Sequence, residues 1–542
     1  MSIMSPQVKI NLPGTSRSKP KKEHPNFRKN VYDYFNEFSN NTSIHGLKWM
    51  CERRRSVIER LWWFILFCIS LYFCVILIIN TWTKWQKSRI MISFAQSPVP
   101  VWEVPFPAVT VCPEMKIRQS KYNFTYYFHE VKKLARKKPT NLTAEELETY
   151  SKSSLLCDSF LYQGGNKSED SEIIDYLESI APSFTDVMVF STWTNVTYAE
   201  GCDYSFLPIF TNDGICLTFN MLDKSELLTN KFSERDYHVH KRTAEWDFDD
   251  GYSKDATENA FPKRIMLAGH DNGLTTVLKA YKKDLNYLCH PNQGFKVLLH
   301  HPAEVPRVED QYFRVPLDQE LVLRIKPDMT TTSTNLNHYD PNLRKCFFSK
   351  ERNLQFFKIY TQQNCLIECI ANYTLKKCGC VAYYMPRENL TKICGSGSTK
   401  CILEAHAALL RQDVESATGC NCLPSCTSIK YNAEASYSKF EWENYYKAWK
   451  LSSDEFSTFR LTRIFVYFKE MKFTATVRSE LFGLADFWAN CGGLLGLFTG
   501  FSFLSFVEII YFLSVRLVCN IRHYGRHVWS GSNALIDNNV GS

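Results

Sequence analysis

The 542-residue sequence lacks internal repeats, long low-complexity segments and the common catalytic signatures. It contains neither the His-Glu-x-x-His pair with which zinc proteases hold their metal nor a Gly-x-Ser-x-Gly turn in the setting of a nucleophilic serine. We therefore expect that the protein is not an enzyme and uses no cofactor or metal. A membrane-tethered ectoenzyme or adhesion protein is the weaker alternative.

Charge is nearly absent from two apolar runs, and a helix needs about 20 mostly apolar residues to cross a bilayer. Residues 61–79 contain no charged side chain, and residues 487–515 contain only Glu508. A secretory signal would place its apolar core near the start of the chain, whereas the first 60 residues here are largely polar. We therefore expect a first transmembrane helix at residues 61–80, and a pre-pore segment with the second transmembrane helix at residues 481–515.

Excess basic charge is found only at the two ends of the chain. Residues 1–60 carry a net charge of +7 and residues 516–542 a net charge of +2, which leaves about −1 of the formal +8 for the chain between them. Because Lys and Arg collect on the cytoplasmic side of a membrane, we expect two cytoplasmic tails, an extracellular domain at residues 81–480, and a multi-pass plasma-membrane protein. The basic tails are suited to contact anionic membrane lipid, and nothing favours nucleic-acid binding.

Cysteine is concentrated in the predicted extracellular domain, which holds fifteen of the twenty cysteines, as is typical of an oxidising compartment. Ten of them lie within residues 346–426 and indicate a disulfide ladder. Zinc binding is the competing interpretation, but paired zinc ligands usually have two to four residues between them. Cys378 and Cys380, like Cys420 and Cys422, have only one.

The same region contains six Asn-x-Ser/Thr acceptors for N-glycosylation. They are Asn123, Asn141, Asn166, Asn195, Asn372 and Asn389. Asn40 and Asn41 also match the pattern but lie on the predicted cytoplasmic side, so we expect them to stay unmodified.

Glycine recurs in the second apolar run at Gly492, Gly496 and Gly500, and every fourth residue falls on one helical face. Two interpretations are open. The face is either a dimerisation surface of an ordinary anchor or, with Ser502 nearby, a pore-lining surface where backbone carbonyls and hydroxyls meet an ion.

Several motifs in a consistent order closely resemble the degenerin/epithelial sodium channel family over nearly the whole chain. They are FPAVTVC at residues 106–112, GICLTFN at 214–220, QGFKVLL at 293–299, the cysteine ladder, Gly500-Phe501-Ser502 followed by Glu508, and His45-Gly46 ahead of the first apolar run. The motif sequences are most similar to those of the arthropod pickpocket branch. An ATP-gated channel of the purinergic type would share the two spans but not this ladder or this Gly-x-Ser setting.

The resemblance implies a trimeric, sodium-selective, amiloride-sensitive channel with two transmembrane helices per subunit and a large disulfide-rich α+β extracellular domain. It implies homo- or hetero-trimers of related subunits, Na+ as the permeant ion and amiloride as a blocker. An accessory subunit that does not conduct alone is the alternative, and the gating stimulus stays open among mechanical, chemical and osmotic signals.

The resemblance also assigns residues of the pore. The filter falls on Gly500, Phe501 and Ser502, the upper pore on Asn490, Gly492 and Gly493, the degenerin-type gating position on Ala489, and the cytoplasmic lower pore on His45 and Gly46. Phe501 is larger than the residue often found there, and we expect it to pack outward. Glu508 either lines the inner mouth or pairs with a basic residue such as Arg516.

The disulfide pairing rests on the resemblance as well, because spacing alone does not determine connectivity. The implied pairs are Cys346–Cys426, Cys365–Cys422, Cys369–Cys420, Cys378–Cys401, Cys380–Cys394, Cys112–Cys216 and Cys157–Cys202. Cys289 is then left over.

Local patterns in the predicted extracellular domain favour strands at residues 295–300 and 320–325 and helices at 144–152 and 401–411. The acidic and aromatic stretch at residues 246–252 is predicted to be a solvated loop, with proton or ligand sensing as the alternative. The basic stretch at residues 132–138 is predicted to be a solvated helix face rather than a processing site. His238 and His240 lack further metal ligands nearby.

Overall fold

The structure is a computed structural model that divides into two compact units. The helical unit comprises residues 1–89 and 481–542, and the disulfide-rich unit comprises residues 90–480. The structure describes residues 27–52, 55–87, 90–157, 162, 164–194, 196–197, 206–232, 243–309, 311–415, 420–450, 454–525 and 529–531.

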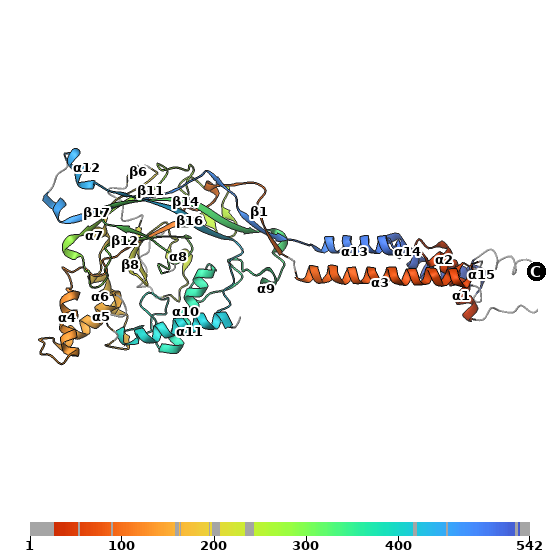
Figure 1. Ribbon diagram of the computed structural model, residues 1–542, viewed down its shortest axis with the longest axis horizontal. Coiled ribbons are helices and arrows are strands. Elements are labelled where there is room, and N and C mark those ends of the chain that lie inside the picture. Colours follow the sequence, from red (N-terminus) through yellow and green to blue (C-terminus); the bar gives the residue numbers. More distant parts are fainter. Residues whose placement is uncertain are drawn as a thin grey trace, which may run out of the picture. The chain divides into compact units, whose positions relative to one another are not determined.

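The helical unit is built around α3 (Val57–Lys87), which contains the first apolar run and packs against α13 (Leu484–Thr499) (Figure 1). Within the part of the chain that the structure describes, two helices are long and apolar enough to cross a membrane, at Val57–Gln86 and Phe503–His523. Ahead of α3 lie α1 (Phe27–Asn41) and the short α2 (Leu47–Cys51).

The second apolar run is not one helix, which corrects the sequence prediction. α13 ends at Thr499, α14 (Phe503–Tyr511) begins after a three-residue break, and a π-helical turn (Phe512–Arg516) joins it to α15 (Leu517–Tyr524). The hydropathy of the run hides this break, because Phe501 keeps the segment apolar while the residues on either side of it end one helix and begin the next.

The largest sheet in the disulfide-rich unit has eight strands in the order β1-β19-β14-β17-β11-β5-β6, with β16 on the other edge of β14. The strand bounds are β1 (Ile90–Phe94), β19 (Thr476–Glu480), β14 (Gln319–Thr332), β17 (Phe459–Phe468), β11 (Gly273–Tyr281), β5 (Met188–Trp193), β6 (Val196–Thr197) and β16 (Ser428–Lys439). β14 and β16 pair antiparallel over twelve residues, from Gln319 opposite Lys439 to Thr330 opposite Ser428.

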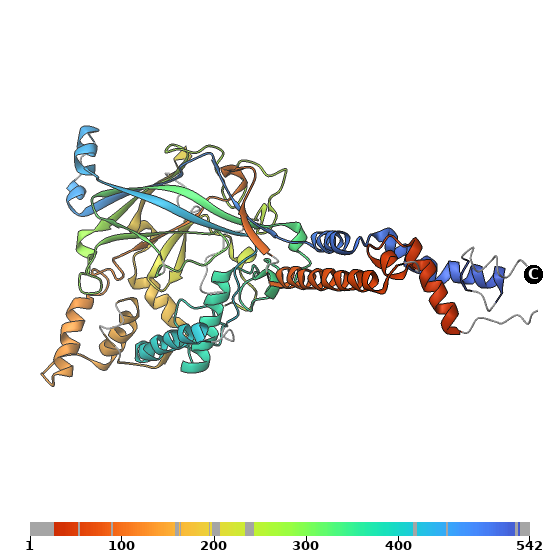
Figure 2. The ribbon, with the colours of Figure 1, turned by 45° about the vertical axis from the view of Figure 1, so that its right-hand side comes forward.

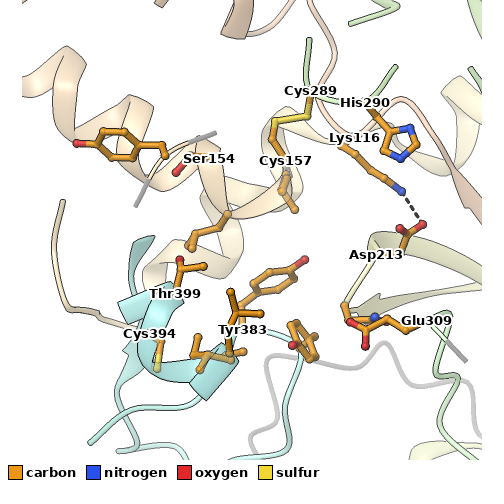
Figure 3. Close-up of a pocket in the computed structure, with 18 of the residues that line it drawn as sticks. Lys116, Ser154, Cys157, Asp213, Cys289, His290, Glu309, Tyr383, Cys394 and Thr399 are labelled. Carbon is orange, nitrogen blue, oxygen red and sulfur yellow. Dashed lines mark hydrogen bonds and ion pairs between the residues drawn. A yellow bond between two sulfur atoms is a disulfide. The ribbon is translucent and has the colours of Figure 1, made fainter. Parts of the chain in front are cut away.

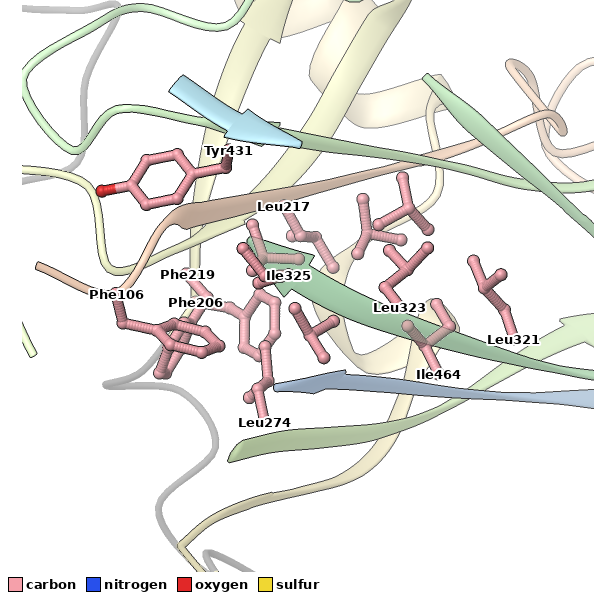
Figure 4. Packing of buried hydrophobic residues seen from close by; sticks show 14 of the residues in the cluster. Phe106, Phe206, Leu217, Phe219, Leu274, Leu321, Leu323, Ile325, Tyr431 and Ile464 are labelled. Atoms are coloured by element: carbon pink, nitrogen blue, oxygen red, sulfur yellow. The ribbon is translucent and has the colours of Figure 1, made fainter. Parts of the chain in front are cut away.

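The second-largest sheet has five strands in the order β13-β12-β3-β8-β7. Their bounds are β13 (Phe313–Pro316), β12 (Gly294–His300), β3 (Ala108–Pro113), β8 (Gly214–Phe219) and β7 (Phe206–Thr211). Buried side chains from these two sheets form the main core (Figure 4). In this core Phe106 meets Phe219 and Phe468 edge to face. The strands predicted at residues 295–300 and 320–325 are confirmed as parts of β12 and β14.

Helices flank the sheets of this unit. They are α4 (Phe124–Ala135), α5 (Ala144–Ser153), α6 (Glu172–Ile180), α7 (Phe184–Val187), α8 (Lys224–Leu227), α9 (Pro341–Arg344), α10 (Gln362–Cys378), α11 (Thr399–Glu415) and α12 (Trp442–Ala448). α5 and α11 confirm the two predicted helices, and α10 and α11 lie beside each other in cyan in Figure 2. Thr143 and Glu146 form a capping box that starts α5.

Seven disulfides are formed among the described residues, and six of the predicted pairs are confirmed. These are Cys112–Cys216, Cys346–Cys426, Cys365–Cys422, Cys369–Cys420, Cys378–Cys401 and Cys380–Cys394. The prediction for Cys157 is wrong, because it bonds to Cys289 with the two Cα atoms 4.8 Å apart. The Asn286 side chain accepts the backbone N–H of Cys289 and holds it in a buried turn against Cys157, whereas Cys202 lies outside the described residues.

The acidic and aromatic stretch is also different from its prediction. Residues 246–252 form a hairpin of β9 (Trp246–Asp247) and β10 (Gly251–Tyr252) rather than a solvated loop, and Phe248 is buried. Asp247 pairs with Lys350 at 2.9 Å, and Asp249 accepts the backbone N–H of Ser349 at 2.9 Å. The acidic side chains therefore fasten the hairpin to residues 349–350.

The predictions about exposed segments of this unit agree with the structure where it describes them. Residues 132–138 lie at the end of α4 and beyond it with exposed side chains, as the solvated-face interpretation requires. Among the glycosylation acceptors, Asn123, Asn141, Asn166, Asn372 and Asn389 are exposed, and Asn195 lies outside the described residues. Their modification stays a prediction.

Candidate functional site

The break in the second apolar run is made by the two ends of the Gly500-Phe501-Ser502 triplet. Gly500 has a φ of +66° in the left-handed region, and its N–H donates to the carbonyl of Gly496 at 2.9 Å, which ends α13. Ser502 caps α14, because its hydroxyl accepts the N–H of Ser505 at 3.2 Å while the Ser505 hydroxyl accepts the N–H of Ser502 at 3.0 Å. The triplet therefore takes its backbone out of the helical hydrogen-bond pattern in the middle of an apolar segment.

The His45-Gly46 pair lies directly against this break. The backbone N–H of His45 donates to the carbonyl of Thr499 at 2.9 Å. A Cβ atom added to Gly500 would lie only 2.3 Å from Nδ1 of His45, so the imidazole ring occupies the space that any larger residue at position 500 would need. Gly46 has a φ of +90°, which lets the chain turn from His45 into α2. The sequence placed these two motifs at opposite ends of the chain, and the structure brings them into one site.

Two serines and Glu508 tie the loop before His45 to α14. The Ser43 hydroxyl lies 2.7 Å from the Ser505 hydroxyl, and both the N–H and the hydroxyl of Ser43 lie 3.1 Å from Oε2 of Glu508. The predicted alternative partner of Glu508 is wrong, because Arg516 instead pairs with Glu37 at 3.0 Å.

Ser43 and Ser505 were not singled out from the sequence. Ser43 stands two residues before the recognised His-Gly pair, and Ser505 stands three residues after Ser502 in the spacing of a capping box. These two short-range patterns in the sequence therefore indicate both serines as candidates for the site.

One face of α13 is uncovered in this chain. Phe487 and Cys491 are buried on the side toward α3, where the Phe487 ring lies 5.5 Å from Trp82. The predicted gating and upper-pore residues all have exposed side chains or, for the glycines, exposed backbone. They are Ala489, Asn490, Gly492 and Gly493.

This uncovered face is shaped by small residues. A Cβ added to Gly492 or Gly493 would meet no atom within 4 Å, and Gly496 lies seven residues beyond Ala489 on the same face. Small residues allow another helix or an ion to approach the backbone closely. The side chain of Asn490 donates to the carbonyl of Asp486 at 2.8 Å and so lies along its own helix.

The disulfide-rich unit contains a separate cavity of about 310 Å³ around a buried charge cluster (Figure 3). Asp213 accepts from Lys116 at 2.6 Å and from Lys296 at 2.5 Å, and the Cys157–Cys289 bond forms part of the wall. Burial raises the pKa of Asp213, but the two lysines outweigh it and hold that pKa below its ordinary value. Burial lowers the pKa of Lys116, and Asp213 opposes this shift.

Replacing Asp213 with asparagine is expected to lower the free energy of unfolding by about 3 kcal/mol, because it leaves Lys116 buried without its ion-pair partner and leaves Lys296 with the more distant Glu114, at 3.9 Å. The thermal unfolding of the purified chain at pH 7 measures this loss. The exposed Asp271, which contacts only His270 at 3.2 Å, serves as the matched control, and Asp271→Asn should cost under about 1 kcal/mol. Since the folded pKa of Asp213 is depressed, its stabilisation is complete above about pH 4 and is lost only as the pH falls further. Equal stability of the two variants would contradict the prediction.

Among the described residues, no three or more His, Cys, Asp or Glu side chains are grouped so as to hold a metal ion. His238 and His240 lie outside the described residues.

Comparison with known proteins matches a family described as amiloride-sensitive sodium channel to residues 38–512. The chain is 29% identical to Pickpocket protein 28 of Drosophila melanogaster over 510 residues, which is 89% of this chain and 78% of that protein. It is 23% identical to Sodium channel protein Nach of Drosophila melanogaster, covering 90% of this chain and 88% of that protein. It is 22% identical to Acid-sensing ion channel 2 of Homo sapiens, covering 87% and 84%.

Proposed function

Because the chain belongs to the amiloride-sensitive sodium channel family, whose members are ion channels and not enzymes, we propose that it forms the pore of a sodium-selective, amiloride-blocked plasma-membrane channel. Channels of this family assemble from related subunits, and we assign this chain to a homo- or hetero-trimer with both tails in the cytoplasm. The disulfide-rich unit is extracellular in this family, and in our proposal it receives the sensory stimulus.

The break at the Gly500-Phe501-Ser502 triplet is the observation that carries the proposal. A passive anchor gains nothing from interrupting its helix within the membrane, since each freed backbone group costs energy unless it faces water, an ion or a protein partner. Next to the break, the uncovered small-residue face of α13 leaves room for close approach of ions or of neighbouring subunits.

Each residue has a role in the proposal. Gly500, Phe501 and Ser502 form the narrow filter, with the Phe501 ring packed outward, and Glu508 attracts cations at the inner mouth. Ala489 is the gate, because its small side chain lets neighbouring α13 helices close on one another. His45 and Gly46 brace the filter from below, which their contact with Thr499 and Gly500 supports.

Replacing Ala489 with phenylalanine is expected to hold neighbouring helices apart and to raise the resting sodium current about tenfold, which corresponds to a shift of about 1.4 kcal/mol in the closing equilibrium. Voltage clamp in sodium, then in potassium, then in sodium with amiloride measures the current, its selectivity and its block. Leu494→Phe is the matched control, because Leu494 lies on another face of α13 and is partly buried.

Surface labelling accompanies these recordings. If Ala489→Phe reaches the surface but stays silent alone, co-expression with related subunits distinguishes an accessory subunit from a wrong pore assignment. An accessory subunit would alter the current of its partner subunits, but Ala489→Phe would not raise that current further. A potassium-selective or amiloride-insensitive current would refute the proposed selectivity or block.

A further inference from the structure

The two ends of the chain meet at the Glu37 carboxylate, which is buried on α1. One carboxylate oxygen, Oε1, accepts from Nη2 of Arg516 at 3.0 Å and from Nε of Arg516 at 3.3 Å. The other, Oε2, accepts from the Ser530 hydroxyl at 2.7 Å and from the backbone N–H of Gly531 at 2.8 Å. A single side chain thus joins α1, the end of the second candidate span and the carboxy-terminal segment at residues 529–531.

The carboxy-terminal segment is docked by more than this carboxylate. Ser530 is 2% exposed, and the Trp529 ring meets the Phe27 ring edge to face at 5.4 Å. The buried Asn520 side chain donates to the Trp529 carbonyl at 2.7 Å. A Cβ added to Gly531 would lie 3.1 Å from Nη2 of Arg516, so the segment fits closely around the ion pair.

α1 also contacts the second span directly. The Tyr34 hydroxyl donates to the carbonyl of Phe512, and the Phe38 ring packs edge to face on the Phe512 ring at 5.4 Å. Four residues separate the end of α1 from Gly46, and that short stretch includes Ser43 and His45 of the filter brace. The position of α1 is therefore linked mechanically to the contact between His45 and Gly500.

We propose that residues 529–531 are an intramolecular ligand of α1, and that their docking on Glu37 holds the His45 loop against the break in the second apolar run. Hydrogen-bond complementarity favours this occupant, because one carboxylate oxygen of Glu37 accepts from the Arg516 guanidinium and the other accepts two neutral donors from the tail. Release of the tail removes two donors from the carboxylate and opens it to water, which screens its ion pair with Arg516 and so weakens the contact of α1 with Arg516. The effect of the docking on current rests on the proposed channel function, whereas the docking itself does not.

Cysteine trapping in the full chain tests the docking. In the variant Glu37→Cys with Ser530→Cys, a short bis-methanethiosulfonate crosslinker is expected to join the two thiols through reducible disulfides, since the two side-chain oxygens now lie 2.7 Å apart and cysteine is two bonds shorter than glutamate. A protease site inserted between Gly525 and Trp529 and a carboxy-terminal tag report the bond. After cleavage the tag should stay with the full chain without reductant and run with the short peptide after reduction.

Two controls separate this bond from chance collisions. Ser530→Cys alone tests capture by the native thiols of the helical unit, and Asn41→Cys with Ser530→Cys moves the partner one helical turn along α1 to an exposed position. Release of the tag without reductant from the Glu37→Cys pair would overturn the docking. A crosslinked dimer of chains before proteolysis would overturn its intramolecular form.

The regulatory effect is measured in the same cysteine pair by voltage clamp in an Ala489→Phe background. Crosslinking followed by reductant is expected to change the current at least about twofold and reversibly, the fold-change that about 0.4 kcal/mol produces. Ser530→Asp should mimic the released state because it places a second carboxylate against Glu37, and adding Glu37→Gln should restore the starting current because the Gln amide donates to the new carboxylate. A trapped tail with unchanged current would overturn the regulatory effect and leave the channel assignment intact, whereas absence of any current would count against the proposed function alone.

Discussion

Replacing Gly500 with alanine is expected to reduce the amiloride-blocked current about tenfold or more, even where the chain reaches the cell surface. Two costs add at this position. The φ of +66° is unfavourable for an L-residue by roughly 1–2 kcal/mol, which by itself approaches a tenfold effect. The new methyl group would also lie 2.3 Å from Nδ1 of His45, so the ring must leave its place below the filter.

A second substitution isolates the ring contact from the backbone strain. When His45 is also replaced with alanine, the collision is gone and only the backbone strain is left. We therefore expect Gly500→Ala to reduce the current less in the His45→Ala background than in the chain that keeps His45. Gly496→Ala is the matched control within the chain, because its Cβ would meet only the Phe501 carbonyl oxygen at an ordinary 3.9 Å. Recordings in an Ala489→Phe background, normalised to surface-labelled protein, make the comparison. Undiminished current from Gly500→Ala would mean that His45 does not brace the filter in the working channel.

What the sequence predicts well in this protein is local. Apolar length marks both candidate spans, short alternating or periodic stretches mark β12, β14, α5 and α11, and dense cysteine spacing marks the ladder. These features depend on residues close together in the chain, so their patterns survive without knowledge of the tertiary structure.

What the sequence does not predict is long-range pairing. His45 and Gly500 are 455 positions apart in the sequence, and nothing in either motif specifies the other as its neighbour. The alternative pairing of Glu508 with a basic residue such as Arg516 places the partners eight residues apart, and eight residues of helix span about 12 Å, which is too far for a direct ion pair. Arg516 instead meets Glu37, a residue that only the tertiary structure brings close.

The break at residues 500–502 lies between these two cases. Glycine at a helix end and serine at a helix start are recognisable signals, but the apolar pattern of the run continues through both of them. A run that is apolar on both sides favours one continuous span. The left-handed glycine and the serine cap break the helix only when a partner such as the His45 loop fills the space beside them.

Replacing Cys289 with serine is expected to destabilise the disulfide-rich unit by about 2–5 kcal/mol and to remove most of the protein from the cell surface. The bond to Cys157 closes a loop with a sequence separation of 132 residues and crosses a buried cluster that includes Ile174 and Leu177. Constraining so long a loop removes much conformational freedom from the unfolded chain. Surface biotinylation and the thermal midpoint of the solubilised protein measure the two effects.

The double variant Cys157→Ser with Cys289→Ser should be as unstable as Cys289→Ser alone, since both lose one bond, and it excludes mispairing by a stranded thiol. Cys202→Ser is the discriminating control. It leaves all seven bonds in place, so surface level and thermal midpoint should stay near those of the unsubstituted chain. Peptide mapping without reductant should recover Cys157 linked to Cys289. A Cys157–Cys202 peptide, together with a loss of surface protein in Cys202→Ser, would support the pairing that the family resemblance implied. The charged cavity around Asp213 would then have a different wall, because the Cys157–Cys289 bond would not be part of it.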